Sequence, residues 1–484
     1  MTHSYKTFVN PALAVSFAGV GAYAFIVSPA KAPWVDELYT WYGIRHETFG
    51  QFAESMASGV NFSPPLYFFL NWLGQLAVPL SLDALRMESL LWILGGAFLA
   101  NLAVRPAAGE LASAAGAAVV LLQSVLLREQ AQEARQYGML FFCGAAVAFS
   151  SSRLLKSPSC KKSQALHFLA HLALCLTHYL GIVFSVAATL AQMIARNRKD
   201  GKFGPPRIEM LAWAPAITLY LWLLSHQSSH LGNWPRPNAI ADLASLYLGS
   251  FLPMTLAIPF LALLLTKEIK SPNPKALCTE TQVARFHLLL FSLFWLTIPA
   301  GVWLLSHLSE FNLFKARYFI PKEVGCMLLL SILLSKLPAP STPCLKNHLP
   351  HLTIITFSLA FLALATQRFL FSLDPAHNYH HRLIVDASIL NSSPPKIYAG
   401  DHLYFPNKYA SPAKTVSFLL LPSSQKDTYR RFSKHVKALT PEEAKLLPQY
   451  LLVTDKERPN ESALPSRPNA LSQAYHLRGR APGH

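Results

Sequence analysis

Charged residues are scarce in this chain. Only 14% of its 484 residues are Asp, Glu, Lys or Arg, whereas 52% are hydrophobic. A soluble domain averages about 25% charged residues, so this composition argues against an ordinary soluble enzyme. Acidic residues are the scarcer kind, because 25 Asp and Glu stand against 42 Lys and Arg and leave a net charge of +17. Such an excess is typical either of a nucleic-acid-binding protein or of a membrane protein with its cations on one side.

Phosphate-binding glycine loops are lacking as well. The sequence contains neither a Walker loop nor a Gly-x-Gly-x-x-Gly motif, so nothing in it supports ATP-driven transport by this chain alone. The six cysteines show no Cys-x-x-Cys or other metal-binding spacing. We expect all of them to lie in membrane spans or cytoplasmic loops, which leaves the external parts without a disulfide framework: Cys143, Cys160, Cys175, Cys278, Cys326 and Cys344.

Long apolar runs are what the sequence has in abundance. A membrane span needs about 20 apolar residues, and each must be helical because lipid offers no partner to free backbone groups. The first run is interpreted as a span and not as a cleaved signal peptide, because it is longer than the apolar region of a signal peptide. We expect eleven spans, at residues 9–28, 87–104, 110–127, 137–154, 164–177, 180–195, 208–225, 241–265, 285–305, 318–335 and 351–371.

Residues 66–80 are apolar but short, and they end near Pro79. If they do not cross and the N-terminus is cytoplasmic, four loops rich in Lys and Arg all face the cytoplasm, as the positive-inside rule requires. If they cross, all four loops lie on the wrong side. We therefore expect an interfacial or re-entrant helix inside a long first external loop, 29–86. The Lys and Arg residues then mark the cytoplasmic side of the membrane, and they are not interpreted as a nucleic-acid-binding surface. The four loops are 153–163, 196–207, 267–275 and 336–346.

The chain changes character after residue 371. No long apolar run follows, and with eleven spans the C-terminus is external. Residues 372–460 are expected to form a small external α/β domain, with a helix beginning at Thr440. Residues 461–484 are rich in Pro, Ser and Arg and are expected to be disordered. The predicted fold is an all-α polytopic membrane protein over residues 1–371 followed by this domain, whose expected strands are 396–400, 416–422 and 450–455.

The polar residues of the predicted external loops form one candidate site. Cations there suit a phosphate, which arginine holds by charge-assisted bonds, and a carboxylate suits a general base. Singly, each feature has an ordinary explanation as a helix cap, a surface ion pair or a headgroup anchor. Together they favour a site for a phosphate-linked donor and a nucleophilic acceptor. The candidates are Asp36, Glu37, Tyr67, Glu133, Arg135, Tyr137, His178, Lys315, Arg317 and Tyr318.

Three histidines share one helical face, at spacings of four and seven residues: His167, His171 and His178. This pattern fits a proton path or a metal site. No carboxylate is placed near them by the sequence, so histidines in the interior of a helical bundle are the favoured interpretation.

Six short motifs follow one another along residues 9–335: Asp36-Glu37, Pro64-Pro65-Leu66-Tyr67, Leu85–Ser89, Glu133–Gly138, Thr177–Gly181 and Ala316–Pro321. Their order and sidedness resemble the polytopic glycosyltransferases of the C superfamily. The nearest branch holds the protein O-mannosyltransferases and the lipid A aminoarabinose transferases. The C-terminal part is not covered by the resemblance. A departure occurs at Ser63, where many relatives have histidine.

The resemblance implies an inverting transfer from a polyprenyl-phosphate sugar donor to lipid A, another envelope glycan or a protein. It places the reaction at the external face of a bacterial inner membrane, among membrane lipids. Asp36 would be the base with Glu37 beside it, and Glu133 a second acidic position. Cations and a histidine would hold the departing phosphate: Arg135, His178 and Arg317, supported by Tyr137 and Tyr318. Some relatives bind a divalent metal, which nothing in this sequence positions.

Two other classes remain open. A transporter or flippase of a lipid-linked substrate would share the many spans and the basic face. Such carriers usually carry ionisable residues inside their spans and show repeated halves, and neither is evident here. A non-catalytic membrane scaffold that presents the C-terminal domain would have no reason to gather carboxylates and arginines on one face.

Overall fold

The computed structural model describes residues 11–27, 31, 33–201, 206–227, 240–248, 279–309 and 314–336, together with five strands between 396 and 477. The chain divides into two units by its internal contacts. The first comprises residues 1–26, 86–222 and 231–365, and the second comprises 27–85, 223–230 and 366–484. The predicted span 351–371, the loop 267–275 and the predicted helix at Thr440 lie outside the described residues.

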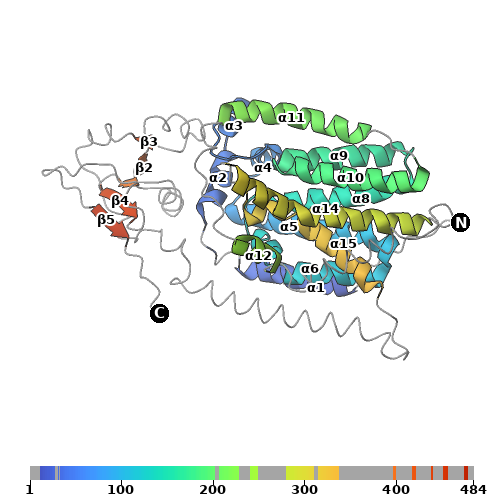
Figure 1. The fold of residues 1–484 in the computed structure, drawn as a ribbon. Coiled ribbons are helices and arrows are strands. Elements are labelled where there is room, and N and C mark those ends of the chain that lie inside the picture. The colour runs from blue at the N-terminus through green and yellow to red at the C-terminus, as the bar shows by residue number, and fades with distance from the viewer. Residues whose placement is uncertain are drawn as a thin grey trace. The chain divides into compact units, whose positions relative to one another are not determined.

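The described part of the first unit is a bundle of helices (Figure 1). Glycine and tryptophan contacts set its packing: Gly116 on one helix faces Ser331 on another, and Trp295 Nε1 donates to the Phe184 carbonyl at 2.9 Å. The helices are α1 (Pro11–Val27), α5 (Leu82–Ala108), α6 (Glu110–Gln123), α7 (Val125–Gln130), α8 (Tyr137–Lys156), α9 (Lys161–Thr177), α10 (Gly181–Asp200), α11 (Arg207–Gln227), α12 (Ile240–Leu248), α14 (Glu280–Leu308), the 3-10 turn η3 (Ala316–Phe319) and α15 (Lys322–Leu334).

Four of the described helices are long and apolar enough to cross a membrane: α5, α8, α11 and α14. They confirm the spans predicted at 87–104, 137–154, 208–225 and 285–305. Together with the shorter apolar helices α1 and α6, they make the chain a multi-pass membrane protein. The count of eleven spans stays a prediction.

Two predicted spans have different bounds in the structure. The run 318–335 begins with η3, and its α-helix starts only at Lys322 after Pro321, which leaves 13 residues. Because a proline favours the first turn of a helix and not its interior, η3 and α15 do not form one continuous helix. Similarly, α6 ends at Gln123, and Ser124 begins the separate helix α7 by accepting a bond from the Leu127 N–H.

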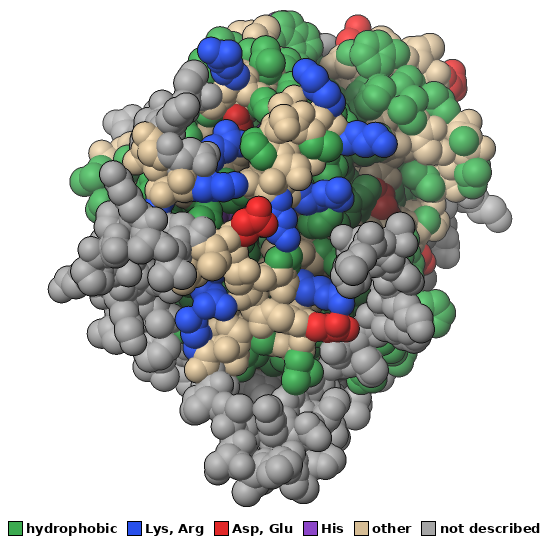
Figure 2. Space-filling model, turned by 90° about the vertical axis from the view of Figure 1, so that its right-hand side faces the viewer, with side chains coloured by type: hydrophobic (Ala, Val, Ile, Leu, Met, Phe, Trp, Pro, Cys, Tyr) green, Lys and Arg blue, Asp and Glu red, His purple; other side chains and the backbone are tan. Residues whose placement is uncertain are grey.

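The helices of the bundle alternate in direction, so the ends predicted to be cytoplasmic meet. Lys199 Nζ donates to the Leu155 carbonyl at 3.2 Å, and the Arg198 guanidinium lies 4.4 Å from the Phe286 ring centre. These contacts join the C-terminal ends of α8 and α10 to the N-terminal end of α14. Figure 2 shows Lys and Arg side chains gathered on one face of the molecule. Exposed cations at this end include Arg153, Lys156, Lys161, Lys162 and Lys336.

The second unit contains three short helices, α2 (Val35–Gly43), α3 (Phe49–Ala57) and α4 (Leu66–Ala77). Trp72 of α4 stacks on Phe52 of α3 at 5.3 Å, and its Nε1 donates to the His46 carbonyl at 2.9 Å. At 12 residues α4 rises about 18 Å, too short for a hydrocarbon core of about 30 Å. Its length therefore agrees with an interfacial or re-entrant helix at 66–80.

The second unit also carries a parallel sheet in the order β3-β2-β1-β4-β5, that of a doubly wound α/β sheet. The strands are β1 (Lys396–Tyr398), β2 (Ser417–Leu420), β3 (Ala438–Leu439), β4 (Leu451–Asp455) and β5 (Ala474–Leu477). Ile397 pairs with Phe418 on one side and with Leu452 on the other. The three predicted strands are confirmed. Residues 474–477 lie in the segment 461–484, where composition predicted disorder, and instead pair with β4.

Candidate active site

Three aromatic rings form a buried cluster at the end of the bundle away from the exposed cations. Tyr137 and Tyr318 are stacked with ring centres 6.0 Å apart. The His178 ring lies 4.6 Å from Tyr318 and 6.1 Å from Tyr137. All three side chains are at most 9% exposed. Residues from three predicted loops, distant in the sequence, therefore meet as expected.

The position of Tyr137 depends on a close helix contact. Tyr137 is the first residue of α8, and a Cβ on its neighbour Gly138 would lie 2.7 Å from the Ser89 carbonyl oxygen of α5. The hydroxyl of Ser89 donates to the Glu133 carbonyl at 2.6 Å and approaches that of Arg135 at 3.4 Å. Helix α5 thus holds the segment 133–138 against the bundle.

His178 lies in a tight turn between α9 and α10. Its Nδ1 accepts a bond from the Leu180 N–H at 3.1 Å, and its carbonyl accepts one from the Gly181 N–H at 2.7 Å. The hydroxyl of Tyr220 on α11 donates to the carbonyls of Cys175 and His178. Gly181 is required here, because a Cβ would collide with the Leu174 carbonyl. The turn is therefore fixed by bonds from both of its sides.

The environment of His178 keeps its ring neutral. Burial, with the positive charges of Arg135 and Arg317 nearby, lowers the pKa of His178 to about 3. Because Nδ1 is the acceptor for the Leu180 N–H, the neutral ring carries its hydrogen on Nε2. His178 can thus donate one hydrogen bond without adding a charge.

Two arginines border the aromatic cluster. The Arg317 guanidinium lies 5.6 Å from the ring centre of Tyr137 and 6.0 Å from that of Tyr318. Arg135 is 7% exposed and close enough to His178 to act on its charge. The half-buried Lys315 is the residue before η3, and its carbonyl accepts a bond from the Tyr318 N–H at 2.9 Å. The half-buried Glu133 precedes this group on the chain.

In the second unit, the two predicted acids differ in their surroundings. Both lie in the first turn of α2, where a carboxylate favours the positive end of the helix dipole. Glu37 is buried, and its carboxylate accepts a bond from the Trp34 N–H at 3.3 Å, which caps the helix. Asp36 is half-buried. Of the two, Glu37 has a structural task in the helix start.

The segment that leads to Tyr67 is tied to α2. Asn61 Nδ2 donates to the Tyr39 carbonyl at 2.9 Å, and the Ser63 N–H donates to the Asn61 carbonyl at 2.7 Å. Tyr67 is fully buried in the first turn of α4, and its carbonyl accepts a bond from Asn71. Ser63 is buried too.

The structure adds a buried ion pair that the sequence analysis missed. Lys322 Nζ and Glu323 Oε1 are 2.6 Å apart, and both side chains are about 1% exposed or less. Adjacent charges at the start of an apolar run are rare in membrane proteins and would have been the signal. Two further arginines, Arg86 and Arg128, are 3% exposed and were also missed.

The three histidines His167, His171 and His178 do not share one set of hydrogen-bond partners. His167 Nε2 lies 2.9 Å from Glu209 Oε1, and the His167 and His171 rings are 4.3 Å apart. His171 Nδ1 bonds Ser185 at 2.6 Å. His178 has the separate partners described above. Among the described residues no group of three or more His, Cys, Asp or Glu could hold a metal ion.

Solved structures of ArnT resemble most of the chain. A crystal structure of ArnT from Cupriavidus metallidurans bound to undecaprenyl phosphate matches with a TM-score of 0.58 and 13% identity, over 90% of this chain and 91% of that one. The chain shares the ArnT fold. The apo structure of ArnT matches with a TM-score of 0.57 and 14% identity, over 88% and 89% of the two chains.

The likeness to ArnT shows a shared fold. It extends beyond residues 9–335, because 90% of the chain is covered. No protein-family model and no curated protein sequence matches the chain. The similarity to ArnT is therefore evident from the three-dimensional structure and not from these sequence comparisons.

Proposed function

We propose that this protein is a membrane glycosyltransferase that moves a sugar from a polyprenyl-phosphate donor to an acceptor at the external face of the membrane. The observation that carries the proposal is the cluster of Tyr137, His178 and Tyr318 bordered by Arg135 and Arg317. The ArnT fold supports it, because one ArnT structure is bound to undecaprenyl phosphate. The acceptor class is lipid A, another envelope glycan or a protein.

The phosphate has a defined set of partners in this proposal. Two guanidinium groups offer charge-assisted bonds to its oxygens. Neutral His178 donates a further bond through Nε2 without repelling them. Since these groups are held in place before the substrate binds, they stabilise the charge that develops on the departing phosphate. Lys315 adds a third positive charge, and Glu133 and Tyr67 remain candidates for contacts with the sugar or the acceptor.

The chemical step is a displacement at the anomeric carbon. The nucleophilic atom of the acceptor, a hydroxyl oxygen or an amine nitrogen, forms a bond to that carbon. The bond from the carbon to the phosphate oxygen breaks. Polyprenyl phosphate leaves with the bonding electrons. The Asp36 carboxylate takes the proton of the nucleophile, and Glu37 keeps the start of α2 in place by its bond to the Trp34 N–H. Attack from the face opposite the phosphate inverts the anomeric configuration.

A flippase for a lipid-linked substrate is the second candidate, because the bundle contains buried ionisable groups. His167 and Glu209 are both buried in helices, as are Lys322 and Glu323. Groups of this kind are typical of transport pathways. The two candidates differ in one product, since only a transferase breaks the bond between sugar and phosphate.

The test uses the purified full-length protein in detergent with a donor labelled in its sugar. We expect polyprenyl phosphate to be released together with labelled acceptor, offered in turn as lipid A, envelope glycan and protein. Asp36→Asn should lower kcat by about 10²- to 10⁴-fold, as loss of a general base does. Arg317→Ala should lower kcat/KM by about 10- to 150-fold, equivalent to one charged hydrogen bond.

Matched controls separate these effects from loss of fold. Glu110→Gln removes an exposed carboxylate, and Arg153→Ala removes an exposed cation at the other end of the bundle. Both should keep wild-type turnover. Full turnover of Asp36→Asn and Arg317→Ala would show that these residues are wrongly assigned. Donor movement across vesicles without release of polyprenyl phosphate would establish the flippase instead.

A further inference from the structure

A polar pocket lies at the opposite end of the bundle from His178. Its volume is about 350 Å³, within the range of small-ligand sites. Gln164 of α9 lines it, about 20 Å from His178 along the helix at 1.5 Å per residue. The pocket is thus separate from the candidate active site. Its other lining residues come from the C-terminal ends of α8 and α10, the loop after α8 and the start of α11, and they include Arg196, Lys199, Arg207 and Glu209.

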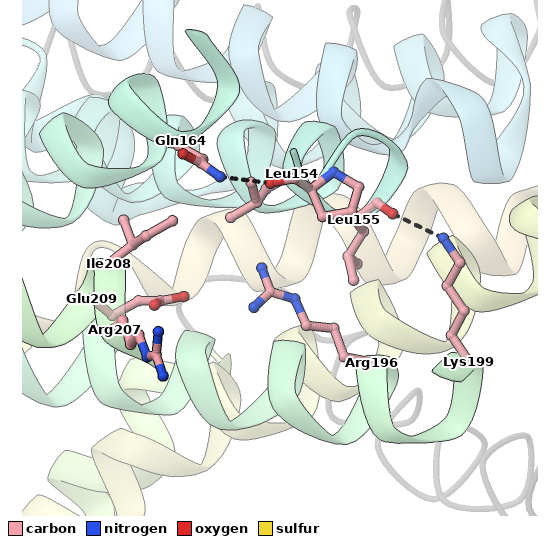
Figure 3. Close-up of a pocket in the computed structure, with 9 residues that line it drawn as sticks. Leu154, Leu155, Gln164, Arg196, Lys199, Arg207, Ile208 and Glu209 are labelled. Carbon is pink, nitrogen blue, oxygen red and sulfur yellow. Dashed lines mark hydrogen bonds between the residues drawn. The ribbon is translucent and has the colours of Figure 1, made fainter. Parts of the chain in front are cut away.

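Positive charge predominates in this pocket. Arg196, Lys199 and Arg207 line it against a single carboxylate, that of Glu209. Figure 3 shows Arg196 and Glu209 pointing toward one another across the pocket. The Glu209 carboxylate is also bonded to His167 Nε2 at 2.9 Å. The acid therefore has partners within the protein, and the pocket keeps an excess of cations.

Hydrogen bonds to backbone carbonyls hold two of the polar side chains that line the pocket. Lys199 Nζ uses one of its hydrogens on the Leu155 carbonyl at 3.2 Å, and the ammonium group has three. Gln164 Nε2 donates to the Pro158 carbonyl at 2.8 Å, which fixes the loop between α8 and α9 (Figure 3). Arg207 is exposed at the first residue of α11. An anion in the pocket would meet cations from two helices.

Apolar surface adjoins the pocket on the helices that form it. On α9, Leu166 is 36% exposed and Leu169 57% exposed, within two turns of Gln164. On α11, Met210 is 54% and Leu211 66% exposed, directly after Glu209. In a membrane-spanning bundle such side chains face lipid tails. The pocket therefore lies where a headgroup would be if acyl chains covered these residues.

We propose that this pocket binds the phosphate of an anionic membrane lipid, with the lipid's acyl chains against the exposed leucines of α9 and α11. Basic pockets between membrane helices recognise lipid phosphates in this way. The site uses Arg196 and Arg207 for charge-assisted bonds to phosphate oxygens, and Lys199 as an additional charge. Binding there would join the helix pair α8–α9 to the pair α10–α11 in the leaflet opposite the active site.

The test titrates the purified full-length protein, in a neutral detergent, with a short-chain phosphatidylglycerol. Thermal unfolding is followed by tryptophan fluorescence. Phosphatidylcholine of the same chain length and inorganic phosphate serve as the other two arms. We expect a saturable rise in Tm with phosphatidylglycerol, at a Kd at least about tenfold below those of the other two probes. Arg207→Gln should weaken phosphatidylglycerol binding about tenfold, as loss of one charged hydrogen bond does.

The matched control is Lys162→Gln, which removes an exposed cation of α9 that does not line the pocket. It should bind phosphatidylglycerol as the wild type does. Arg196→Gln provides a second test if Arg207→Gln proves insufficiently folded to measure. Equal affinities for Arg207→Gln and Lys162→Gln would refute the site, as would equal affinities for phosphatidylglycerol and phosphatidylcholine. Inorganic phosphate binding as tightly as phosphatidylglycerol would refute the lipid as its source.

Discussion

Replacing His178 by asparagine should make the protein less sensitive to acid. Asparagine keeps an acceptor for the Leu180 N–H, since its side chain bonds the backbone two residues on, but it cannot titrate. In the wild type, burial and the nearby guanidinium groups lower the pKa of His178 from 6.5 to about 3. At mildly acidic pH the His178 ring therefore binds a proton in the unfolded chain but not in the folded chain.

The sign and size of the effect follow from this difference. The stability linked to His178 is fully present above about pH 6.5 and is lost as the pH falls toward 3, because the unfolded state binds the additional proton. Each pH unit in that window costs about 1.4 kcal/mol. Between pH 7.5 and pH 5.5 the wild type should thus lose about 1.4 kcal/mol more free energy of unfolding than His178→Asn.

The assay is denaturant unfolding of both proteins in detergent at pH 7.5, 6.5 and 5.5, followed by tryptophan fluorescence. Other groups titrate in both proteins alike, so the difference between the two curves isolates His178. Identical pH dependences would show that the ring is protonated or solvated in the folded state. A wild type that gains stability in acid relative to the variant would reverse the sign and refute the reasoning.

Gly138→Ala should cost about 1–3 kcal/mol of unfolding free energy, because its Cβ would lie 2.7 Å from a backbone oxygen of Ser89 that cannot move aside. The control Gly301→Ala meets nothing within 4 Å in α14 and should be neutral or stabilising in the same measurement. Lys322→Met should destabilise by about 3–5 kcal/mol, since it leaves the buried carboxylate of Glu323 without its cation. The double variant Lys322→Met with Glu323→Leu should recover most of that loss in stability. A double variant as unstable as Lys322→Met would show that the loss does not come from the unpaired Glu323 carboxylate.

The long apolar helices could be predicted from the sequence because hydropathy alone determines them. Positions 87–104, 137–154, 208–225 and 285–305 needed only length and apolar composition. The break at 318–335 was missed, since Pro321 precedes a new helix inside a run that is largely apolar apart from Lys322 and Glu323. Hydropathy does not distinguish one helix from two that meet at an angle.

The site shows the same division. The arrangement of Tyr137, His178, Tyr318 and two arginines followed from loop sidedness, which places distant segments at one end of a bundle. The different environments of Asp36 and Glu37 could not be predicted, because burial depends on the direction in which α2 presents each side chain. The pair Lys322–Glu323 did carry a signal, because adjacent charges at the start of an apolar run are rare in membrane proteins. That both side chains are buried and paired depends on helix packing, which hydropathy does not describe.

The turn at His178 has a consequence for how the protein meets its ligand. Tyr220 reaches it from a different helix, and Gly181 leaves no room for a side chain beside Leu174. A group restrained in this way loses little freedom when a ligand arrives, so ordering it subtracts little from the affinity. Amide hydrogens of Leu180 and Gly181 should accordingly exchange with solvent deuterium as slowly without ligand as with it, which makes this turn a fixed reference against which movement elsewhere in the chain can be measured.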